Sequence, residues 1–313
     1  HDATIRPYGP IEMNPATVVL HYAQETFEGL KAYRRADGQI QLFRPEMNAR
    51  RMINSNERLC MATIPEDMFI EAVNALVKAE EDWVPSEPET SLYIRPFAFA
   101  CESSLGVHKS KAYKFVIILS PVGAYYAEGL APVKIMVEDE YVRAVQGGTG
   151  FTKCGGNYAG SIIGQVKAEK YGCSQVLWLD GRERKYVEEV GAMNIMFKID
   201  GEIYTAPIEG TVLPGVTRDS IIHILKDWGY KVNETHLSVD DLMQAGRDGR
   251  LEEVYGTGTA AVISPVGALV YKGEEITINN FKIGDLTQKL YDYLTGIQWG
   301  KEEDKYGWTR LVK

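Results

Sequence analysis

The sequence predicts an α+β protein with two domains. The chain has 313 residues, and a domain usually takes roughly 150 residues. Segments with helical spacing of apolar residues and segments with strand composition both occur, but they do not alternate regularly, which disfavours a doubly wound parallel sheet. Apolar residues make up 45% and charged residues 25% of the chain, which is typical of a globular protein and excludes a disordered one.

The first predicted domain, residues 1–120, is small and mixed. Its clearest helix is expected from Pro65 to Trp83, because apolar residues recur there every three or four positions with acidic residues between them. A second helix is expected from Pro45 to Met61, with proline near its start, where a missing N–H costs least. Strands are expected at residues 40–43, 91–100 and 114–122.

Residues 121–132 are predicted to form the interdomain linker, because this segment is bracketed by prolines, contains two glycines and lacks a clear period. The second predicted domain, residues 133–313, is larger and rich in strands. Strands are expected at residues 133–137, 175–179, 185–190, 194–199, 231–234, 251–255 and 261–264. Helices are expected at residues 159–171, 217–228, 238–245 and 283–297.

Charge and composition exclude several classes of protein. The 34 basic residues against 43 acidic ones give a net charge of −9, which argues against nucleic acid as the main partner. No apolar run approaches the roughly 18 residues that a membrane span needs, and no signal peptide is visible. The four cysteines form no C-x-x-C pair and the five histidines no metal motif. We therefore expect no membrane and no metal, and a cytoplasmic location, with an organelle matrix as the alternative; the opening His1 suggests that a short N-terminal piece is missing.

The densest chemical signal lies between Gly147 and Tyr158, where glycines bracket Lys153 on both sides. The segment is not a Walker A loop, because Thr152 precedes the lysine. Glycine lets the backbone approach a bound molecule closely, and a desolvated lysine in such a place can form a Schiff base. The alternative, a solvated lysine on a surface loop, is the more common situation for a single lysine.

Two turns are candidate anion sites. Leu213 to Ser220 carries a Pro-Gly turn that leads into a helix, whose first N–H groups lack partners; simple helix capping is the commoner alternative. Tyr255 to Ala261 fits the weak dinucleotide fingerprint G-x-G-x-x-A. The residues after it predict strands with a break at Pro265 rather than a helix, which argues against a dinucleotide site.

Two predicted strands carry polar pairs. Alternation along Lys185–Val190 places Glu188 and Glu189 on opposite faces, so one carboxylate shares a face with an apolar neighbour. A buried carboxylate with a partner and a half-exposed edge strand both fit this pattern. Tyr93 and Arg95 face one side of their strand and offer a hydroxyl and a guanidinium to a substrate carboxylate; a surface arginine over an aromatic ring is the alternative. A reactive amine with anion-holding turns is what a pyridoxal phosphate enzyme needs.

Eight segments, in order between Pro7 and Gln298, carry a resemblance to a known family: Tyr22 with Phe27-Glu-Gly-Leu-Lys31, Phe43-Arg-Pro with Ala49-Arg-Arg51, Ser91-Leu-Tyr-Ile-Arg-Pro96, Pro121-Val-Gly-Ala-Tyr125, Lys153-Cys-Gly-Gly-Asn-Tyr158, Glu189-Val-Gly-Ala-Met-Asn194, Leu213-Pro-Gly-Val-Thr-Arg218 and Gly256-Thr-Gly-Thr-Ala260. Together they resemble the branched-chain amino acid aminotransferases, which are fold-type IV pyridoxal phosphate enzymes. The resemblance implies transfer of an amino group between L-leucine, L-isoleucine or L-valine and 2-oxoglutarate.

The resemblance also implies a role for each matching residue toward pyridoxal 5′-phosphate. Lys153 would form the Schiff base and move the substrate proton, and Glu189 would face the pyridine nitrogen. Tyr158 would hydrogen-bond the phenolic oxygen. The phosphate would be bound by Arg51, Val216, Thr217 and Thr259.

Substrate contacts follow from the same resemblance. The Tyr93 hydroxyl and the N–H groups of Thr259 and Ala260 would bind the substrate carboxylate, and Arg95 with Tyr125 would meet the γ-carboxylate of glutamate. The apolar pocket would be lined by Phe27, Tyr22, Tyr158 and Ala192. Leu105 and Val107 would reach in from a second subunit, which implies a homodimer.

Other functions remain as alternatives. A D-amino acid aminotransferase or an aminodeoxychorismate lyase would share the fold, although Tyr93, Arg95 and the stretch from Phe27 favour the branched-chain family. A nicotinamide-dependent dehydrogenase would rest on the Gly256 fingerprint and predicts a helix after Ala261. A catalytically dead protein would have lost a cofactor residue, yet Lys153, Arg51 and Glu189 are all present.

Overall fold

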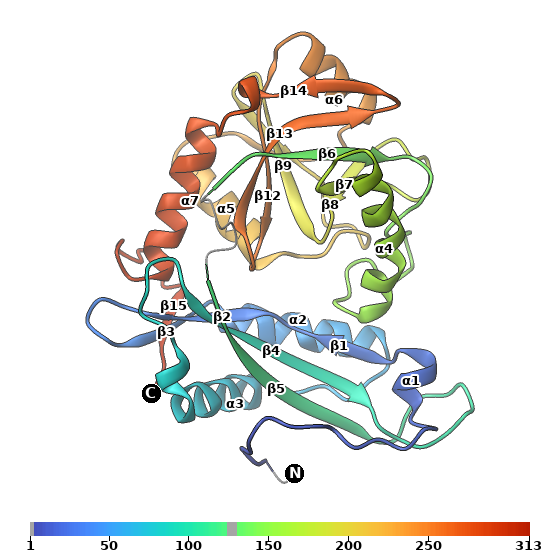
Figure 1. Cartoon of the computed structure of the whole chain (residues 1–313), viewed down its shortest axis with the longest axis vertical. Coiled ribbons are helices and arrows are strands. Elements are labelled where there is room, and N and C mark those ends of the chain that lie inside the picture. Colours follow the sequence, from blue (N-terminus) through green and yellow to red (C-terminus); the bar gives the residue numbers. More distant parts are fainter. Residues whose placement is uncertain (1–2, 124–129) are drawn as a thin grey trace. The chain divides into compact units, whose positions relative to one another are not determined.

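The computed structural model describes residues 3–123 and 130–313 and contains both helices and strands, as predicted for an α+β protein (Figure 1). The chain forms two compact units: the first holds residues 1–123, 152–155 and 297–313, and the second holds residues 124–151 and 156–296. Among the described residues, no helix is long and apolar enough to cross a membrane.

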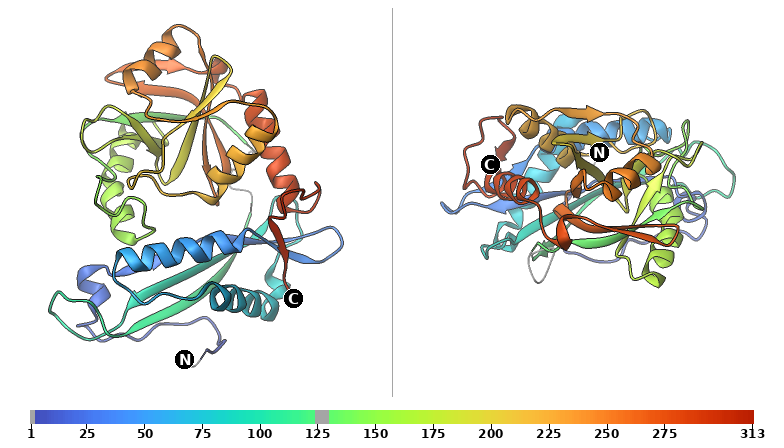
Figure 2. Two further views of the ribbon diagram at one scale, coloured as in Figure 1. Left: turned by 180° about the vertical axis from the view of Figure 1, so that it is seen from behind. Right: turned by 90° about the horizontal axis from the view of Figure 1, so that it is seen from above.

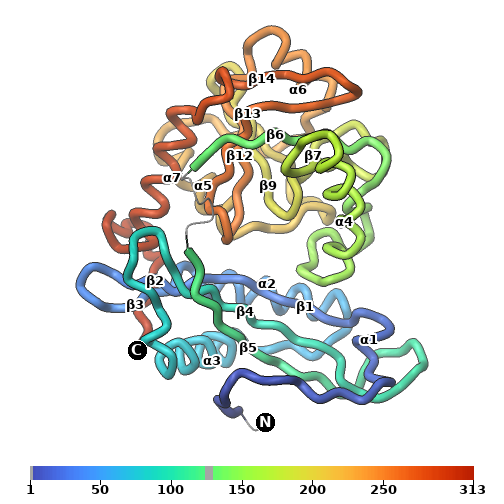
Figure 3. The backbone as a smooth tube through the Cα atoms, viewed as in Figure 1, coloured from blue at the N-terminus to red at the C-terminus, as the bar shows by residue number. Residues whose placement is uncertain are grey.

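The first unit contains a six-stranded antiparallel sheet. Its strands are β1 (Glu25–Phe27), β4 (Ser91–Ala100), β2 (Leu30–Arg34), β3 (Ile40–Phe43) and β15 (Thr309–Leu311), in that order, with β5 (Tyr113–Val122) also paired to β4. The strands β1 and β2 pair with successive stretches of β4, so that Glu28 and Gly29 form the step between them. Figure 3 shows the C-terminal segment returning to lie beside β3.

Helices of the first unit pack on this sheet. They are α1 (Val18–Tyr22), α2 (Pro45–Arg58), α3 (Glu66–Ala79) and the 3-10 turn η1 (Glu81–Trp83). Phe69, Val73 and Val77, four residues apart on α3, are completely buried in one core with Leu42 and Met52. This spacing is the one that predicted the helix, although the helix ends at Ala79 and only the short turn η1 continues to Trp83.

The second unit is built on a nine-stranded sheet. Along the sheet the strands are β11 (Val232–Glu234), β10 (Glu202–Thr205), β9 (Met193–Ile199), β12 (Leu251–Gly258), β13 (Val262–Tyr271), β6 (Val133–Glu138), β7 (Gln175–Leu179) and β8 (Val187–Val190), with β14 (Glu274–Thr277) paired to β13. The strand β8 also pairs with β9, which closes six of these strands into a ring. Because β8 has partners on both sides, the interpretation of this segment as a half-exposed edge strand is wrong.

Helices surround the ring. They are α4 (Gly155–Lys170), α5 (Val216–Asp227), α6 (Val239–Arg247) and α7 (Asp285–Gln298), with the 3-10 turn η2 (Asn279–Phe281). The helix α6 packs into the main core through Val239, Leu242 and Met243. The helix α4 contributes Ala168 to a separate core with Trp178 of β7, and Figure 2 shows it alongside the ring.

Several elements differ from the sequence expectations. The strands β1, β2, β10, β14 and β15 and the helix α1, each of five residues or fewer, were not predicted. The strand β13 continues through Pro265, where a break was expected. Proline is accepted there because β12 pairs with β13 only up to Pro265, and β6 pairs only from Val266 onward, so the missing N–H lies where the partner strand changes.

The two units also differ from the predicted domain ranges 1–120 and 133–313. Residues 297–313 join the first unit because they carry β15, which pairs with β3. Residues 152–155 join it through hydrogen bonds to β1 and α2. Of the predicted linker 121–132, the first two residues belong to β5, and residues 124–129 lie outside the described residues.

Candidate active site

The backbone N–H and carbonyl of Lys153 are both hydrogen-bonded. Its carbonyl accepts a hydrogen bond from the Phe27 N–H at 3.0 Å, and its own N–H donates to the Ser55 hydroxyl at 3.0 Å. Two residues later, the Gly155 N–H donates to the Glu25 carboxylate at 2.6 Å. The ammonium nitrogen lies 4.9 Å from the centre of the Phe27 ring. The lysine is therefore fixed against β1 and α2 rather than placed on a freely solvated loop.

The surroundings of Lys153 favour its neutral amine. Burial lowers the pKa of Lys153 to about 8, and the nearby Arg51 guanidinium acts in the same direction, while Glu28 partly opposes it. An ordinary lysine titrates near pH 10.4. A larger fraction of Lys153 is thus an unprotonated nucleophile at neutral pH, as the interpretation as a reactive amine requires.

Arg51 forms a buried ion pair with Glu28. Its Nε lies 2.7 Å from one carboxylate oxygen and its Nη2 donates to the other at 2.8 Å. Asn48 donates to the same carboxylate at 2.8 Å, and the Gly29 N–H does so at 3.2 Å. The Glu28 side chain is fully buried and that of Arg51 is 7% exposed. The carboxylate therefore fixes the plane of the guanidinium, which sequence reasoning did not foresee.

Tyr93 and Arg95 face the same side of β4, as predicted. The Arg95 guanidinium donates to the Tyr93 hydroxyl at 2.8 Å. It also lies over the Phe27 ring, 4.7 Å from its centre, and over the Tyr93 ring at 5.2 Å. Since Lys153 contacts the same Phe27 ring, the first unit brings together four of the predicted site residues.

Glu189 lies in the second unit and is surrounded by donors. Arg143 Nε is 2.6 Å from one carboxylate oxygen. The other oxygen accepts from the Asn194 amide at 2.9 Å and from the Leu213 N–H at 3.2 Å. The Glu189 residue is only 3% exposed. Two hydrogen-bond donors and the adjacent positive charge of Arg143 stabilise its negative charge, as a partnered buried carboxylate requires.

Asn194 joins Glu189 to two other predicted segments. Besides its bond to Glu189, its amide donates to the Leu213 carbonyl at 2.9 Å, and a side chain in place of Gly215 would collide with its carbonyl oxygen. Asn194 also pairs in register with Thr257 of β12. The second unit therefore brings together the segments that begin at Glu189, Leu213 and Gly256.

The N-terminus of α5 keeps donors for an anion. The helix starts at Val216, and its N-cap residue Gly215 offers no side chain to the first N–H groups. Thr217, in the first turn, is 5% exposed. Simple helix capping by the side chain of the N-cap residue, the alternative for this turn, is thus not observed. The first turn of the helix therefore suits a phosphate.

The remaining predicted residues lie as follows. Tyr158 is half-buried on α4, Ala192 is exposed in the turn between β8 and β9, Thr259 is half-buried and Ala260 exposed after β12, and Leu105 and Val107 are exposed in the loop after β4. Tyr22, at the end of α1, donates its hydroxyl to the Leu105 carbonyl. Tyr125 lies outside the described residues. Among the described residues, no group of three or more metal-ligating side chains occurs.

Strand β13 follows the Gly256 fingerprint after a short turn, at Val262. The helix that the dehydrogenase hypothesis requires after Ala261 is therefore absent from this described stretch, and the dinucleotide interpretation is wrong.

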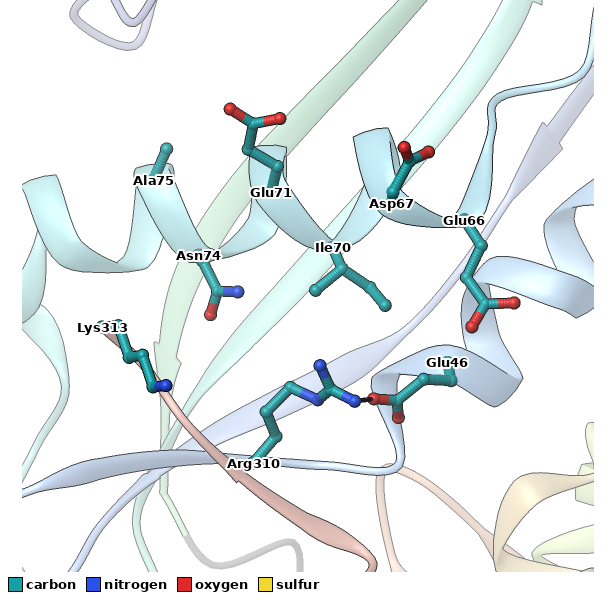
Figure 4. Close-up of a pocket in the computed structure, with 9 residues that line it drawn as sticks. All are labelled: Glu46, Glu66, Asp67, Ile70, Glu71, Asn74, Ala75, Arg310 and Lys313. Carbon is teal, nitrogen blue, oxygen red and sulfur yellow. Dashed lines mark ion pairs between the residues drawn. The ribbon is translucent and has the colours of Figure 1, made fainter.

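An open depression of about 780 Å³ lies on the surface of the first unit, and Figure 4 shows it along α3. Four carboxylates and two basic residues line it, with an ion pair between Arg310 and Glu46. None of the predicted site residues lines it, so it is separate from the cluster around Lys153.

Comparisons with known proteins agree with the geometry. The family model Amino-transferase class IV matches residues 25–269. The Bacillus subtilis (strain 168) branched-chain-amino-acid aminotransferase 2 is 55% identical over 312 residues, which covers 100% of this chain and 86% of the relative.

Two solved structures resemble the chain as a whole. The Escherichia coli branched-chain amino acid aminotransferase matches with a TM-score of 0.81 and 28% identity, and the T.th. branched-chain amino acid aminotransferase with pyridoxamine 5′-phosphate matches with 0.82 and 28%. Each match covers 96% of this chain and 94% of the other. These matches confirm the resemblance that the eight segments predicted and the fold-type IV architecture. The chain belongs to the class IV aminotransferase family.

Proposed function

We propose that this chain catalyses the pyridoxal 5′-phosphate-dependent transfer of an amino group between L-leucine, L-isoleucine or L-valine and 2-oxoglutarate, with a branched-chain 2-oxo acid and L-glutamate as products. The observation that carries the proposal is Lys153, an amine with its pKa lowered to about 8 and held against Phe27. The name of the Bacillus subtilis relative supports the substrate class.

The chemistry of the described residues fits pyridoxal phosphate. Lys153 offers an amine that can bind an aldehyde, and the uncapped start of α5 with Thr217 suits a phosphate group. Glu189 is a buried carboxylate with stabilised charge, which suits a protonated ring nitrogen. The solved relative with pyridoxamine 5′-phosphate supports the same choice.

We assign the cofactor contacts on the resemblance. Lys153 would hold the cofactor covalently, Glu189 would face its ring nitrogen, and Tyr158 would hydrogen-bond its phenolic oxygen. The phosphate would be bound by Arg51, Val216, Thr217 and Thr259. The ion pair with Glu28 supports this role for Arg51, because it holds the guanidinium in one plane before a ligand binds.

Proton transfer at the substrate Cα falls to Lys153. Bound pyridoxal phosphate supplies the electron sink that makes this proton acidic. The Lys153 amine would take the proton from the substrate Cα and release it again in the first half-reaction, and it would move the proton in the opposite direction in the second. A pKa of about 8 suits this work, because the amine then accepts and releases a proton near neutral pH.

The substrate pocket would combine polar groups that bind carboxylates with an apolar wall that contacts the branched side chain. The Tyr93 hydroxyl, with the N–H groups of Thr259 and Ala260, would bind the α-carboxylate. Arg95, with Tyr125, would contact the γ-carboxylate of glutamate, and its position over Phe27 supports a charge held beside an apolar wall. The apolar wall would be formed by Phe27, Tyr22, Tyr158 and Ala192.

The active form would be a homodimer located in the cytoplasm. Leu105 and Val107 are 66% and 81% exposed in the first unit, which supports their insertion into a second subunit. In the second unit, α4 exposes Ile162, Ile163 and Val166 on one face, which is a further surface for a second copy. The four free cysteines suit a reducing compartment.

The experiment that tests the function is a visible absorption spectrum of the protein loaded with pyridoxal phosphate, before and after L-leucine, with D-alanine as the control. A yellow protein whose band is lost with L-leucine and retained with D-alanine supports the proposal. A response to D-alanine alone would move the function to a D-specific aminotransferase of the same fold. A protein that stays colourless after loading would overturn the cofactor assignment.

A further inference from the structure

Arg143, which precedes the glycine-rich loop, is the counter-ion of Glu189. Its Nε lies 2.6 Å from Glu189 Oε2, and the two side chains are 8% and 4% exposed. Its Nη2 donates to the Gly150 carbonyl at 3.0 Å and to the Thr211 carbonyl. The guanidinium is thus fixed by two backbone acceptors as well as by the carboxylate.

The backbone at residue 150 can lie close to the Thr211 carbonyl because residue 150 is glycine. A side chain at this position would collide with the Thr211 carbonyl and with the Ala144 side chain. The close approach lets one guanidinium reach both carbonyls and Glu189 at once. Arg143 therefore connects β8, the loop before Lys153 and the segment before Leu213.

A second buried carboxylate, Glu188, lies next to Glu189 and receives no such pairing. Its Oε2 has no hydrogen-bond partner, and the residue is 7% exposed. Burial raises the pKa of Glu188, while a hydrogen bond with the Thr211 side chain and the charge of Arg143 act in the opposite direction. The close contact of Arg143 thus selects one of two adjacent acids, the one that the resemblance places at the cofactor ring.

We propose that Arg143 is a positioning residue, which holds Glu189 as an oriented carboxylate and thereby keeps the ring nitrogen of the bound cofactor protonated. This inference rests on the proposed function, since it needs Glu189 at that nitrogen. The guanidinium itself touches neither substrate nor cofactor in this role. It acts through Glu189, in the way that an outer residue orients the side chain that makes the direct contact.

The test compares Arg143→Gln and Arg143→Lys with Arg182→Gln, which makes the same change at an exposed arginine. Each protein is loaded with pyridoxal phosphate carrying ¹⁵N in its ring, and the ring nitrogen is observed by NMR. We expect the Arg143→Gln signal to move toward the unprotonated value, Arg143→Lys to move less, and Arg182→Gln to match the wild type. The kcat for L-leucine should fall about 10- to 100-fold in Arg143→Gln, with a much smaller change in KM.

A ring-nitrogen signal in Arg143→Gln that matches the wild type would overturn the inference, even if activity falls. If Arg143→Gln does not fold, Arg143→Lys gives the decision, because a wild-type signal there would also overturn it. Failure of the proposed function looks different: the wild type itself would then give no visible band on loading, and the role of Arg143 would fall with it.

Discussion

Each of the two units contains a buried arginine–glutamate pair, and the roles predicted for the two residues are opposite in the two pairs. In the first unit, Arg51 is the residue predicted to bind the cofactor, and Glu28 is its support. In the second unit, Glu189 is predicted to bind the cofactor, and Arg143 is its support. Both pairs have contacts of 2.6–2.7 Å and side chains that are less than 9% exposed.

The difference lies in where each pair is anchored. Glu28 takes additional hydrogen bonds from the Asn48 amide and the Gly29 N–H. Arg143 donates to the Gly150 and Thr211 carbonyls. In both pairs the supporting residue has extra contacts with its own unit, so that it can orient the partner that is predicted to meet a ligand. Each buried ion pair orients the side chain that is predicted to meet the ligand. Its contribution to the stability of the protein depends on how many of its polar atoms are hydrogen-bonded.

The largest expected effect on stability comes from Glu28→Leu, which leaves Arg51 buried without its carboxylate. We expect the free energy of unfolding to fall by about 3–5 kcal/mol, the usual cost of an uncompensated buried charge. Urea unfolding of the cofactor-free protein measures it. The double variant Glu28→Leu with Arg51→Leu should recover much of the loss, because no buried charge then remains. A double variant less stable than Glu28→Leu would contradict this account.

In the second unit, Glu189→Gln keeps the shape of the side chain and should affect activity more than stability. Arg143 keeps its two carbonyl acceptors, and the amide oxygen of glutamine can still accept from Asn194 or Leu213. We expect a stability loss of about 1 kcal/mol and a fall in kcat of roughly 100-fold, because a charge aimed at the cofactor is removed. Urea unfolding and steady-state kinetics with L-leucine separate the two effects. Equal stability losses in Glu28→Leu and Glu189→Gln would remove the distinction between the pairs.

The pH dependence of Lys153 distinguishes the pairs further, since Arg51 lowers its pKa. The amine reacts only when unprotonated, so its acetylation in the cofactor-free protein should rise with pH, with a midpoint near pH 8. In Arg51→Gln the midpoint should move upward, because a neighbouring positive charge is lost. In Arg143→Gln it should not move. Mass-spectrometric mapping of the acetylated peptide measures both, and an unchanged midpoint in Arg51→Gln would contradict the electrostatic cause.

Sequence patterns predicted the helix α3 and the strands β4 and β7. The helix α3 follows from Phe69, Val73 and Val77, and the bounds predicted for β4 and β7 agree with the structure. The strands β1 and β2 escaped prediction because they are short and lie on either side of Glu28, an acidic residue whose burial only Arg51 explains. Local pattern carries no signal for a partner that lies 23 residues away.

Sequence reasoning proposed the residues that would contact cofactor and substrate, which stay a prediction, and it missed the residues that support them. The pair Tyr93 and Arg95 followed from alternation along one strand, and the structure confirms their common side. Arg143 had no signal, because its acceptors come from three separate segments that only the folded ring brings together. The supports depend on tertiary contacts, whereas several ligands lie in local motifs that the sequence displays directly.

The smallest expected effect tests whether burial, rather than geometry, distinguishes these pairs. Arg50 is the neighbour of Arg51 on α2 and forms the same bidentate contact, in which its Nε and Nη2 lie 2.8 and 3.2 Å from the two carboxylate oxygens of Glu66. Its side chain is 66% exposed, so water screens the pair and competes for both partners. Arg50→Gln should therefore change the urea midpoint less than any variant above, and the change should vanish in about 1 M salt, where charges are screened within about 3 Å. A loss comparable with that of Glu28→Leu would mean that the fork geometry itself stabilises the protein, and the contrast between exposed and buried pairs on one helix would fail.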